Sequence, residues 1–244
     1  MTIHSDAAPL REQVAWACRL LAHEGYADLT LGHVSARNDE TGSVVWIKRR
    51  GVALDEVEPD DVIPLDLDDP AAFEQPDMHA EAVLHTEVYL ARPDVHAVVH
   101  GHPPYATALG AVDAPLELIN HDAVMFVDSL STFEETADLI TATEQGAAVA
   151  SALGAGRAVV MRNHGVLVVG KDVPWAALTA VTLERAVRLQ SIASTLGTLR
   201  PISREHALRL WPDKYNDKQV DEYWASWQRK LDRLGLGISS LSAR

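Results

Sequence analysis

Residues 79–105 read HAEAVLHTEVYLARPDVHAVVHGHPPY, and this stretch decides the fold class. The sequence predicts a helix over 79–91, which ends just before Pro93 because the proline ring disfavours further helix. The short apolar run from Val95 to His100 then predicts a buried strand. A helix followed at once by a strand indicates an α/β protein.

The same alternation continues on both sides of this stretch. Helices are expected over 10–24, 79–91, from Pro104 onward, and over 132–152, 174–196 and 217–233. Strands are expected over 31–38, 43–48, 61–65, 95–100, 123–127, 157–161 and 166–169, with hairpin-turn residues at 39–42. Because no repeat or linker divides the chain, we expect one α/β domain over 1–244, with a helical tail from about residue 200.

The composition excludes several classes of protein. The chain has 244 residues and a formal net charge of −14, which argues against binding a nucleic-acid backbone. No segment approaches the roughly 18 consecutive apolar residues of a membrane span, and the N-terminus lacks the features of a secretory signal. The single cysteine, Cys18, lies in an apolar helical pattern and fits a reducing compartment. We therefore expect a cytoplasmic protein with no nucleic-acid or membrane partner.

Three histidines form a candidate metal centre. His100 and His102 point the same way if the strand continues through Gly101, and two such imidazoles can share an ion such as zinc. Two ligands alone make no stable site, so a surface histidine pair is the alternative. His164 stands beside a glycine between two apolar runs, at 158–169, which indicates close backbone approach. Taken alone, His164 is equally well interpreted as a core histidine.

Glu81 supplies a carboxylate near these histidines. On the predicted helix, Glu81 and His85 are four residues apart and therefore share a face. A carboxylate there can bind the ion or act as a general acid/base. Spacing alone does not distinguish these roles from an exposed helix carboxylate.

These motifs resemble the class II aldolase/adducin family, which includes fuculose-phosphate aldolase and ribulose-phosphate 4-epimerase. The similarity covers most of residues 10–195, in the stretches 31–38, 49–67, 79–111 and 162–186. It implies a three-layer α/β/α fold around a mostly antiparallel sheet. It also implies a homotetramer with sites between subunits.

The resemblance further implies a ligand set. Histidines at the positions of His100, His102 and His164 bind one divalent ion per subunit, with Glu81 as a further ligand or as the acid/base. Zinc is the first expectation, and manganese, iron(II) and cobalt are the alternatives. The ion is expected to act as a Lewis acid that stabilises an enolate.

The loops that hold phosphate in the sugar-phosphate members differ here. Gly32 is retained, but His33 stands where those enzymes usually have asparagine, a basic run at 48–50 replaces a Thr/Ser-rich turn, and His79 precedes Glu81 in place of a serine pair. Since the guanidinium fork pairs naturally with a carboxylate, these changes favour a carboxylate substrate over a phosphate. The alternative is a solvated charge run. The expected substrate contacts are His33, Ser35, Arg49, Arg50 and Gly51.

The segments 46–51 and 79–81 look similar to a branch of the family that decarboxylates hydroxylated aromatic or heteroaromatic acids. We therefore expect a metal-dependent carbon–carbon lyase of aromatic compound catabolism that decarboxylates such a (di)carboxylic acid through a metal-stabilised enolate. Its catalytic candidates are Glu81, His79 and Tyr105, although Tyr105 is equally interpreted as a packed side chain. The alternatives are an aldolase or epimerase acting on a sugar phosphate, and a non-catalytic adducin-like binding module.

Overall fold

The computed structural model describes residues 7–26, 28–38 and 42–239. The start of the chain, used above to judge a secretory signal, lies outside these residues. So do positions 39–41 of the expected hairpin turn.

A seven-stranded mixed sheet runs through the described residues, in the order β3-β2-β1-β4-β7-β6-β5. Neighbouring strands are antiparallel except β5 and β6, which are parallel, so the expected mostly antiparallel sheet is confirmed. The strands are β1 (His33–Arg37), β2 (Val44–Lys48), β3 (Val62–Asp66), β4 (Ala97–Gly101), β5 (Leu130–Phe133), β6 (Ala158–Met161) and β7 (Val166–Gly170).

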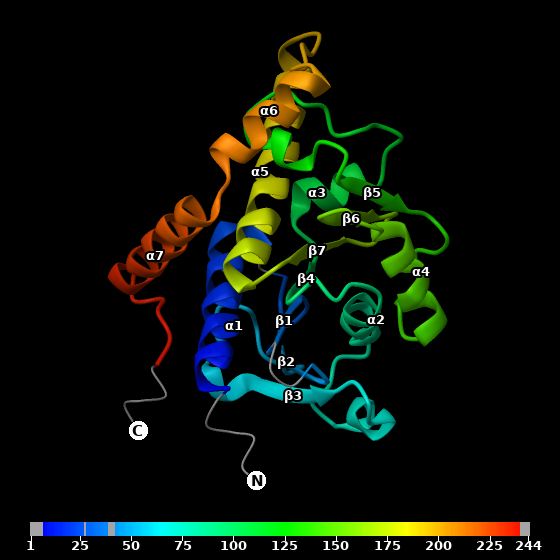
Figure 1. Cartoon of the computed structure of the whole chain (residues 1–244), viewed down its shortest axis with the longest axis vertical. Helices are drawn as coiled ribbons and strands as arrows, with labels where there is room; N and C mark the ends of the chain where they lie inside the picture. Colours follow the sequence, from blue (N-terminus) through cyan, green and yellow to red (C-terminus); the bar gives the residue numbers. More distant parts are fainter. Residues whose placement is uncertain (1–6, 27, 39–41, 240–244) are drawn as a thin grey trace.

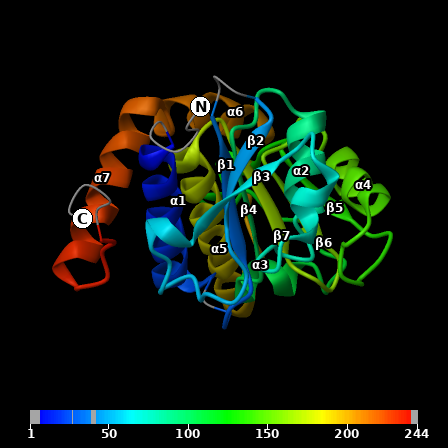
Figure 2. The same cartoon turned by 90° about the horizontal axis from the view of Figure 1, so that it is seen from below.

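Helices cover both faces of the sheet, which confirms the three-layer arrangement (Figures 1 and 2). On one face lie α1 (Ala8–Leu21) and α5 (Val173–Leu196), and on the other lie α2 (Val83–Ala91) and α4 (Thr143–Leu153). The alternation of strand side chains explains the two cores, because Val99 packs with the first pair and its neighbour Val98 with the second. The central strand β4 is therefore apolar throughout until it reaches His100.

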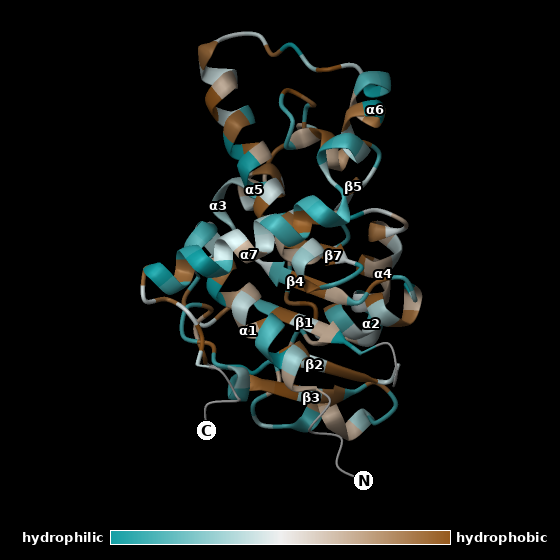
Figure 3. Cartoon of the chain, turned by 60° about the vertical axis from the view of Figure 1, so that its left-hand side comes forward, coloured by the Kyte–Doolittle hydropathy of each residue, from teal (hydrophilic) through white to brown (hydrophobic). Residues whose placement is uncertain are grey.

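The remaining helices lie at the ends of the sheet or outside it. They are α3 (Pro104–Leu109), α6 (Arg204–Lys214) and α7 (Asp217–Arg233). Figure 3 shows the contrast between the hydrophobic strand β3 and the largely hydrophilic α7, which buries Val220 and Leu231. None of the helices in the described ranges is long and apolar enough to cross a membrane.

The predictions of two elements between residues 120 and 153 are wrong. The apolar run expected as a strand at 123–127 is a 3-10 helix, Ala123–Phe126, because Asn120 accepts the amide hydrogens that begin it. A continuous apolar run has no period, so its length and composition did not separate strand from helix. The expected helix over 132–152 begins only at Thr143, since its first residues belong to strand β5.

Two other boundaries also differ from expectation. The helix expected over 79–91 begins at Val83, and residues 80–82 form turns before it. Helix α6 lies in the helical tail expected from about residue 200, but its bounds were not predicted, since it contains Pro212 and buries only Ala207. No strong apolar period marks either helix in the sequence, although Ser203 caps the start of α6 by accepting from the His206 amide.

Candidate metal centre

The three candidate histidines meet at one end of the sheet. His100 lies in β4, His102 follows it directly, and His164 lies in the turn between β6 and β7. Strands β4 and β7 pair Gly101 with Val166, and this register brings the turn beside the end of β4. One ring nitrogen from each histidine lies within 4.8 Å of the others.

Local backbone geometry allows this close approach. Asn163 adopts a positive φ of 54°, which turns the chain sharply before His164. A Cβ atom at Gly165 would lie 2.6 Å from both the Gly101 carbonyl oxygen and a ring carbon of His102. Glycine is therefore required at 165 for the two strand ends to meet around the histidines.

Two of the rings are oriented by bonds at Nδ1. His100 Nδ1 lies 3.1 Å from the Val166 carbonyl oxygen and donates to it, and His100 Nε2 is buried with no hydrogen bond among the described residues. His102 Nδ1 lies 2.9 Å from Asp28 Oδ2 and donates to this carboxylate. A ligating histidine in proteins usually makes this kind of bond with its second nitrogen. Each ring thus presents Nε2 as an acceptor.

The carboxylate of Glu81 lies against the rings of His164 and His100. Glu81 Oε1 is 3.4 Å from His164 Nε2, and Oε2 is 3.8 Å from His100 Nε2. The amide of Ile140 donates to Oε1 at 2.8 Å and holds the carboxylate in place. Glu81 lies in the turn before α2, so the prediction that Glu81 and His85 share a helix face is wrong. His85 lies instead against β1, where it contacts Ser35.

The surroundings of Glu81 keep its carboxylate charged. Burial alone raises its pKa, but His164, His100 and the Ile140 amide outweigh burial and lower the pKa of Glu81 to about 2. The group is therefore an anion at neutral pH. It is better suited to binding a cation than to donating a proton.

These residues fit a divalent ion. The ring nitrogens of His164 and Nε2 of His100 are buried without a hydrogen bond in the described part of the chain, which is costly for polar atoms that bind nothing. Three imidazole nitrogens and one carboxylate form a donor set that zinc and other borderline cations accept. The ligand assignment itself stays a prediction.

A second group of polar side chains lies behind the first. His33 in β1 is paired in register with His100, and their ring centroids are 5.0 Å apart. His33 Nδ1 lies 2.6 Å from His85 Nε2, His85 Nδ1 lies 2.6 Å from Ser35 Oγ, and Ser35 Oγ lies 2.8 Å from the Tyr89 hydroxyl. All four side chains are buried. We call His33, His85, Ser35 and Tyr89 the inner chain.

Burial keeps these imidazoles uncharged. Desolvation, with help from the neighbouring His79, lowers the pKa of His85 to about 3. Desolvation and the surrounding histidines also lower the pKa of His33 well below its usual value. The Ser35 hydroxyl is engaged by both His85 and Tyr89. The hydroxyl is therefore already engaged within the protein. A role for Ser35 in binding substrate stays a prediction.

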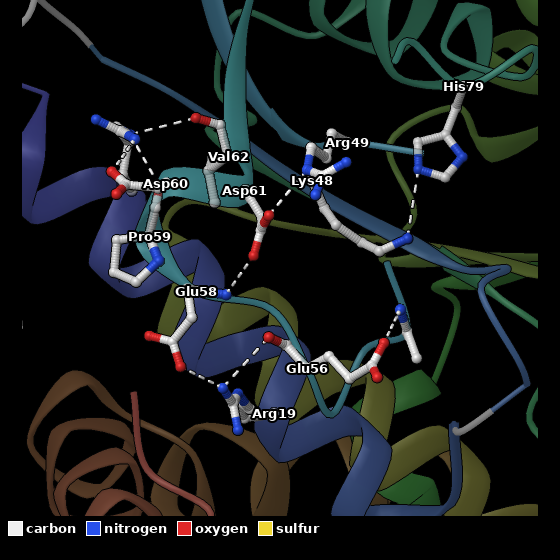
Figure 4. Close-up of polar contacts among 12 residues, drawn as sticks. Arg19, Lys48, Arg49, Glu56, Glu58, Pro59, Asp60, Asp61, Val62 and His79 are labelled. Atoms are coloured by element: carbon white, nitrogen blue, oxygen red, sulfur yellow. Dashed lines mark hydrogen bonds and ion pairs between the residues drawn. The ribbon is translucent and has the colours of Figure 1, made fainter. Parts of the chain in front are cut away.

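Lys48 and His79 form a buried pair beside the inner chain (Figure 4). Lys48 Nζ donates to the carbonyl oxygens of Thr30 and Gly32, each at 3.1 Å, and lies 3.5 Å from His79 Nε2. The His79 ring lies 4.3 Å from the His33 ring. Burial and the Lys48 cation lower the pKa of His79 to about 3.

The two arginines that follow Lys48 have different surroundings. Arg49 Nε lies 2.8 Å from Asp61 Oδ1, and the guanidinium is thereby engaged within the protein (Figure 4). Arg50 is exposed and lines a cavity of about 760 Å³ together with His79. Gly51 has a φ of 85°, which a residue with a side chain rarely adopts. Of the two arginines, Arg50 is the better placed to meet a ligand.

Tyr105 has no contact with the histidines in the described structure. Its amide donates to Glu184 Oε1 at 3.0 Å, and its ring lies 5.7 Å from the Arg188 guanidinium carbon. The buried Glu184 also accepts from the amide of Ala106, so it caps the N-terminus of α3. A catalytic role for Tyr105 stays a prediction.

The sequence interpretation missed Asp28, Lys48, Tyr89 and the polar role of His85. Asp28 reaches the site from a loop and Lys48 from β2, whereas His85 and Tyr89 lie four residues apart on α2 and both contact Ser35. One signal was available, because Lys48 is a charged residue at the end of an otherwise apolar strand. Such a residue is either exposed or specifically paired.

Comparison with known proteins places the chain in a family. Residues 12–191 match the Class II Aldolase and Adducin N-terminal domain. The chain is 32% identical to 3,4-dihydroxyphthalate decarboxylase from Arthrobacter keyseri, over 93% of this chain and 94% of that protein. It is 27% identical to L-fuculose phosphate aldolase from Methanococcus maripaludis, over 73% of this chain and 94% of the aldolase.

A solved structure shows the same fold. The crystal structure of an aldolase II superfamily protein from Pseudomonas syringae superposes with a TM-score of 0.84 at 24% identity, covering 97% of each chain. The family match includes all four candidate ligands, Glu81, His100, His102 and His164. This chain therefore belongs to the class II aldolase and adducin family.

Proposed function

We propose that the protein is a metal-dependent decarboxylase of a hydroxylated aromatic or heteroaromatic (di)carboxylic acid. A lyase is the broad function that the family supports. The observation that carries the finer proposal is a row of imidazoles beside the candidate metal centre. The rings of His79, His33 and His100 follow one another at centroid distances of 4.3 Å and 5.0 Å.

This row lies beside groups that favour an anionic substrate. The cations Lys48 and Arg50 lie next to His79, which lines the cavity together with Arg50. The hydroxyl groups that would surround a phosphate are largely replaced by imidazole and cationic groups. The similarity to 3,4-dihydroxyphthalate decarboxylase supports the same substrate class.

The residues of the chain have separable roles in this proposal. His100, His102, His164 and Glu81 would hold the ion, which supplies Lewis-acid stabilisation of the negative charge left when carbon dioxide departs. The carbon–carbon bond breaks with its electrons remaining on the ring, and the ring carbon then takes up a proton. We assign delivery of that proton to His79 acting as a relay: the uncharged ring would take a proton from the neighbouring Lys48 ammonium, 3.5 Å away, as it passes one to the ring carbon, since Glu81 is already ionised.

Substrate binding is assigned to the side chains around His79. His33 and Arg50 would contact the carboxylates, and Gly51 would provide the turn that presents Arg50. Arg49 would act through its bond to Asp61, which fixes the same turn. Ser35 would act through His85 and His33.

Assembly and location complete the proposal. We propose a cytoplasmic homotetramer with one ion per subunit, zinc first, formed from a single domain over residues 1–244. The exposed apolar side chains of Leu29 and Leu31, 83% and 51% accessible, lie next to Asp28 and support a neighbouring subunit there. Tyr105 would then serve a neighbouring site.

The test is carbon dioxide release by metal-loaded protein. Hydroxylated benzene and pyridine carboxylates form one panel, sugar phosphates run alongside, and a chelator serves as the control. Chelator-sensitive release from an aromatic acid is expected. Aldehyde formation from a phosphosugar without such release would overturn the proposal in favour of an aldolase, a function that the fuculose phosphate aldolase similarity supports. A protein that purifies without metal and cannot be loaded would indicate a binding module.

A further inference from the structure

A second cavity lies at the opposite end of the sheet from the histidines. Its volume is about 650 Å³, and its lining includes the end of β7, the residue before β6, the start of α5 and the last turns of α6. Strand β7 connects the two places, because its first residue, Val166, lies by the candidate metal centre and its last, Gly170, lines the cavity. At a rise of about 3.3 Å per residue, the two ends are roughly 13 Å apart.

The cavity has an aromatic wall. Trp175, Trp211 and Tyr215 line it together. The Trp211 ring lies 6.0 Å from the Trp175 ring and 5.8 Å from the Tyr215 ring. Trp175 is fixed by a bond from its Nε1 to Asp217 at 2.9 Å. The wall is therefore ordered before any ligand arrives.

The acids of the lining are already neutralised. Each of them pairs with a basic side chain: Asp94 with Arg92, Asp128 with Arg204, and Asp217 with Lys171. Arg157 differs from the other cations in the lining, since no carboxylate lies within ion-pairing distance of it in the described residues. The cavity therefore has one uncompensated positive charge.

Arg157 is held in a fixed position. Its guanidinium carbon lies 3.9 Å from the centre of the Trp211 ring. Its Nη1 donates to the Met125 carbonyl oxygen at 3.1 Å and to Ser129 Oγ at 2.9 Å. Nε and Nη2 make no hydrogen bond within the described ranges. These two nitrogens leave one edge of the guanidinium fork available to a ligand.

We infer that this cavity is a binding site for a small carboxylic acid with a ring-sized apolar body. The acid's carboxylate would accept hydrogen bonds from Arg157, and its apolar part would lie against Trp175, Trp211 and Tyr215. The volume lies within the range of roughly 300–1,000 Å³ that small-molecule sites occupy.

The experiment is calorimetric titration of metal-loaded, full-length protein with benzoate, acetate and inorganic phosphate. Benzoate should bind saturably, acetate more weakly, and Arg157→Gln should weaken benzoate binding at least tenfold. Arg157→Lys retains the charge without the fork, so its affinity for benzoate should be intermediate. Thermal unfolding of each variant reports whether it is folded. The variant Arg50→Gln, which alters only the cavity beside His79, separates the two sites, because benzoate binding that depends on Arg157 should persist in it.

Three results would overturn the inference. The first is the absence of saturable benzoate binding to the wild-type protein. The second is equal benzoate binding to folded Arg157→Gln or Arg157→Lys and to the wild type. The third is phosphate binding as tight as benzoate binding and equally dependent on Arg157, since the aromatic wall would then contribute nothing.

Discussion

Two groups of histidines lie side by side in this protein, and they differ in what their nitrogens bind. His100 and His102 each use Nδ1 to hold the ring in place and leave Nε2 for a ligand. In the inner chain, both ring nitrogens of His85 are used, by His33 and by Ser35. One group therefore leaves ring nitrogens available for a ligand, whereas the other bonds within a packed polar interior.

The difference arises from the partner of each Nδ1 atom. A carbonyl oxygen or carboxylate accepts the Nδ1 hydrogen of His100 and His102, so their Nε2 atoms must be acceptors. His33 Nδ1 instead bonds to His85 Nε2, and His85 Nδ1 bonds to Ser35 Oγ. If this comparison is correct, substitutions in the first group should remove metal, and substitutions in the inner chain should mainly reduce stability.

The largest effect is expected from His164→Ala. This change removes a candidate ligand whose ring nitrogens have no hydrogen bond in the described structure, and it also removes the imidazole that lies 3.4 Å from Glu81 Oε1. Metal content should fall from one ion per chain to a small fraction, and any lyase activity by on the order of 10³-fold. Elemental analysis after gel filtration measures the first quantity, and a turnover assay measures the second.

The matched control for His164→Ala is His23→Ala, because His23 is an exposed histidine outside both groups. The control should retain full metal content. Stoichiometric metal in folded His164→Ala would contradict the ligand assignment.

A smaller effect on metal binding is expected from Asp28→Asn. Asp28 accepts the Nδ1 hydrogen of His102 at 2.9 Å and so fixes the ring that presents Nε2. Loss of such a carboxylate typically weakens metal affinity by about 10–100-fold. Competition with a chromophoric chelator measures this affinity. An unchanged affinity would show that the carboxylate does not orient the ring.

The sequence was sufficient for the parts of the site that lie close together along the chain. His100 lies in β4 and His102 directly follows its end, so the strand period predicts that they share a side. The place of His164 followed from a polar break between two apolar runs. The sheet register, which decides that these two segments meet, depends on long-range pairing of β4 with β7 and entered only through the family resemblance.

The sequence was insufficient where contacts between distant segments decide the outcome. Asp28 and Tyr89 reach the histidines from a loop and a helix, and only the folded sheet brings them there. The wrong strand at 123–127 has a local cause instead, because the Asn120 side chain accepts the amide hydrogens of Asp122 and Ala123 at the start of a 3-10 helix. For Asp28 and Tyr89, a local sequence pattern cannot predict the contact, because the position of the contacting residue depends on the rest of the fold.

The inner chain predicts a pH dependence of stability for metal-free protein. His85 has a folded-state pKa of about 3, caused by burial and by His79, whereas an unfolded histidine titrates near 6.5. Below pH 6.5, His85 therefore binds a proton in the unfolded state but not in the folded state, and the free energy of unfolding falls as the pH drops. The slope per buried histidine is about 1.4 kcal/mol per pH unit.

Urea unfolding between pH 6.5 and pH 5 measures this slope, since the carboxylates titrate mainly below that window. His85→Gln should reduce the slope by the share of one histidine. An identical slope in the variant would mean that His85 accepts a proton in the folded state, and the contrast with the first histidine group would be lost.

The smallest effect is expected from Tyr89→Phe. The substitution removes the hydroxyl that lies 2.8 Å from Ser35 Oγ, but Ser35 keeps its bond to His85. The Arg37 guanidinium, 5.1 Å from the ring centre, can stack on phenylalanine as well. The free energy of unfolding should therefore fall by only about 0.5–1.5 kcal/mol, with unchanged metal content. Loss of metal in this variant would show that the inner chain orients the ligands, and the two groups of histidines would then have to be treated as one.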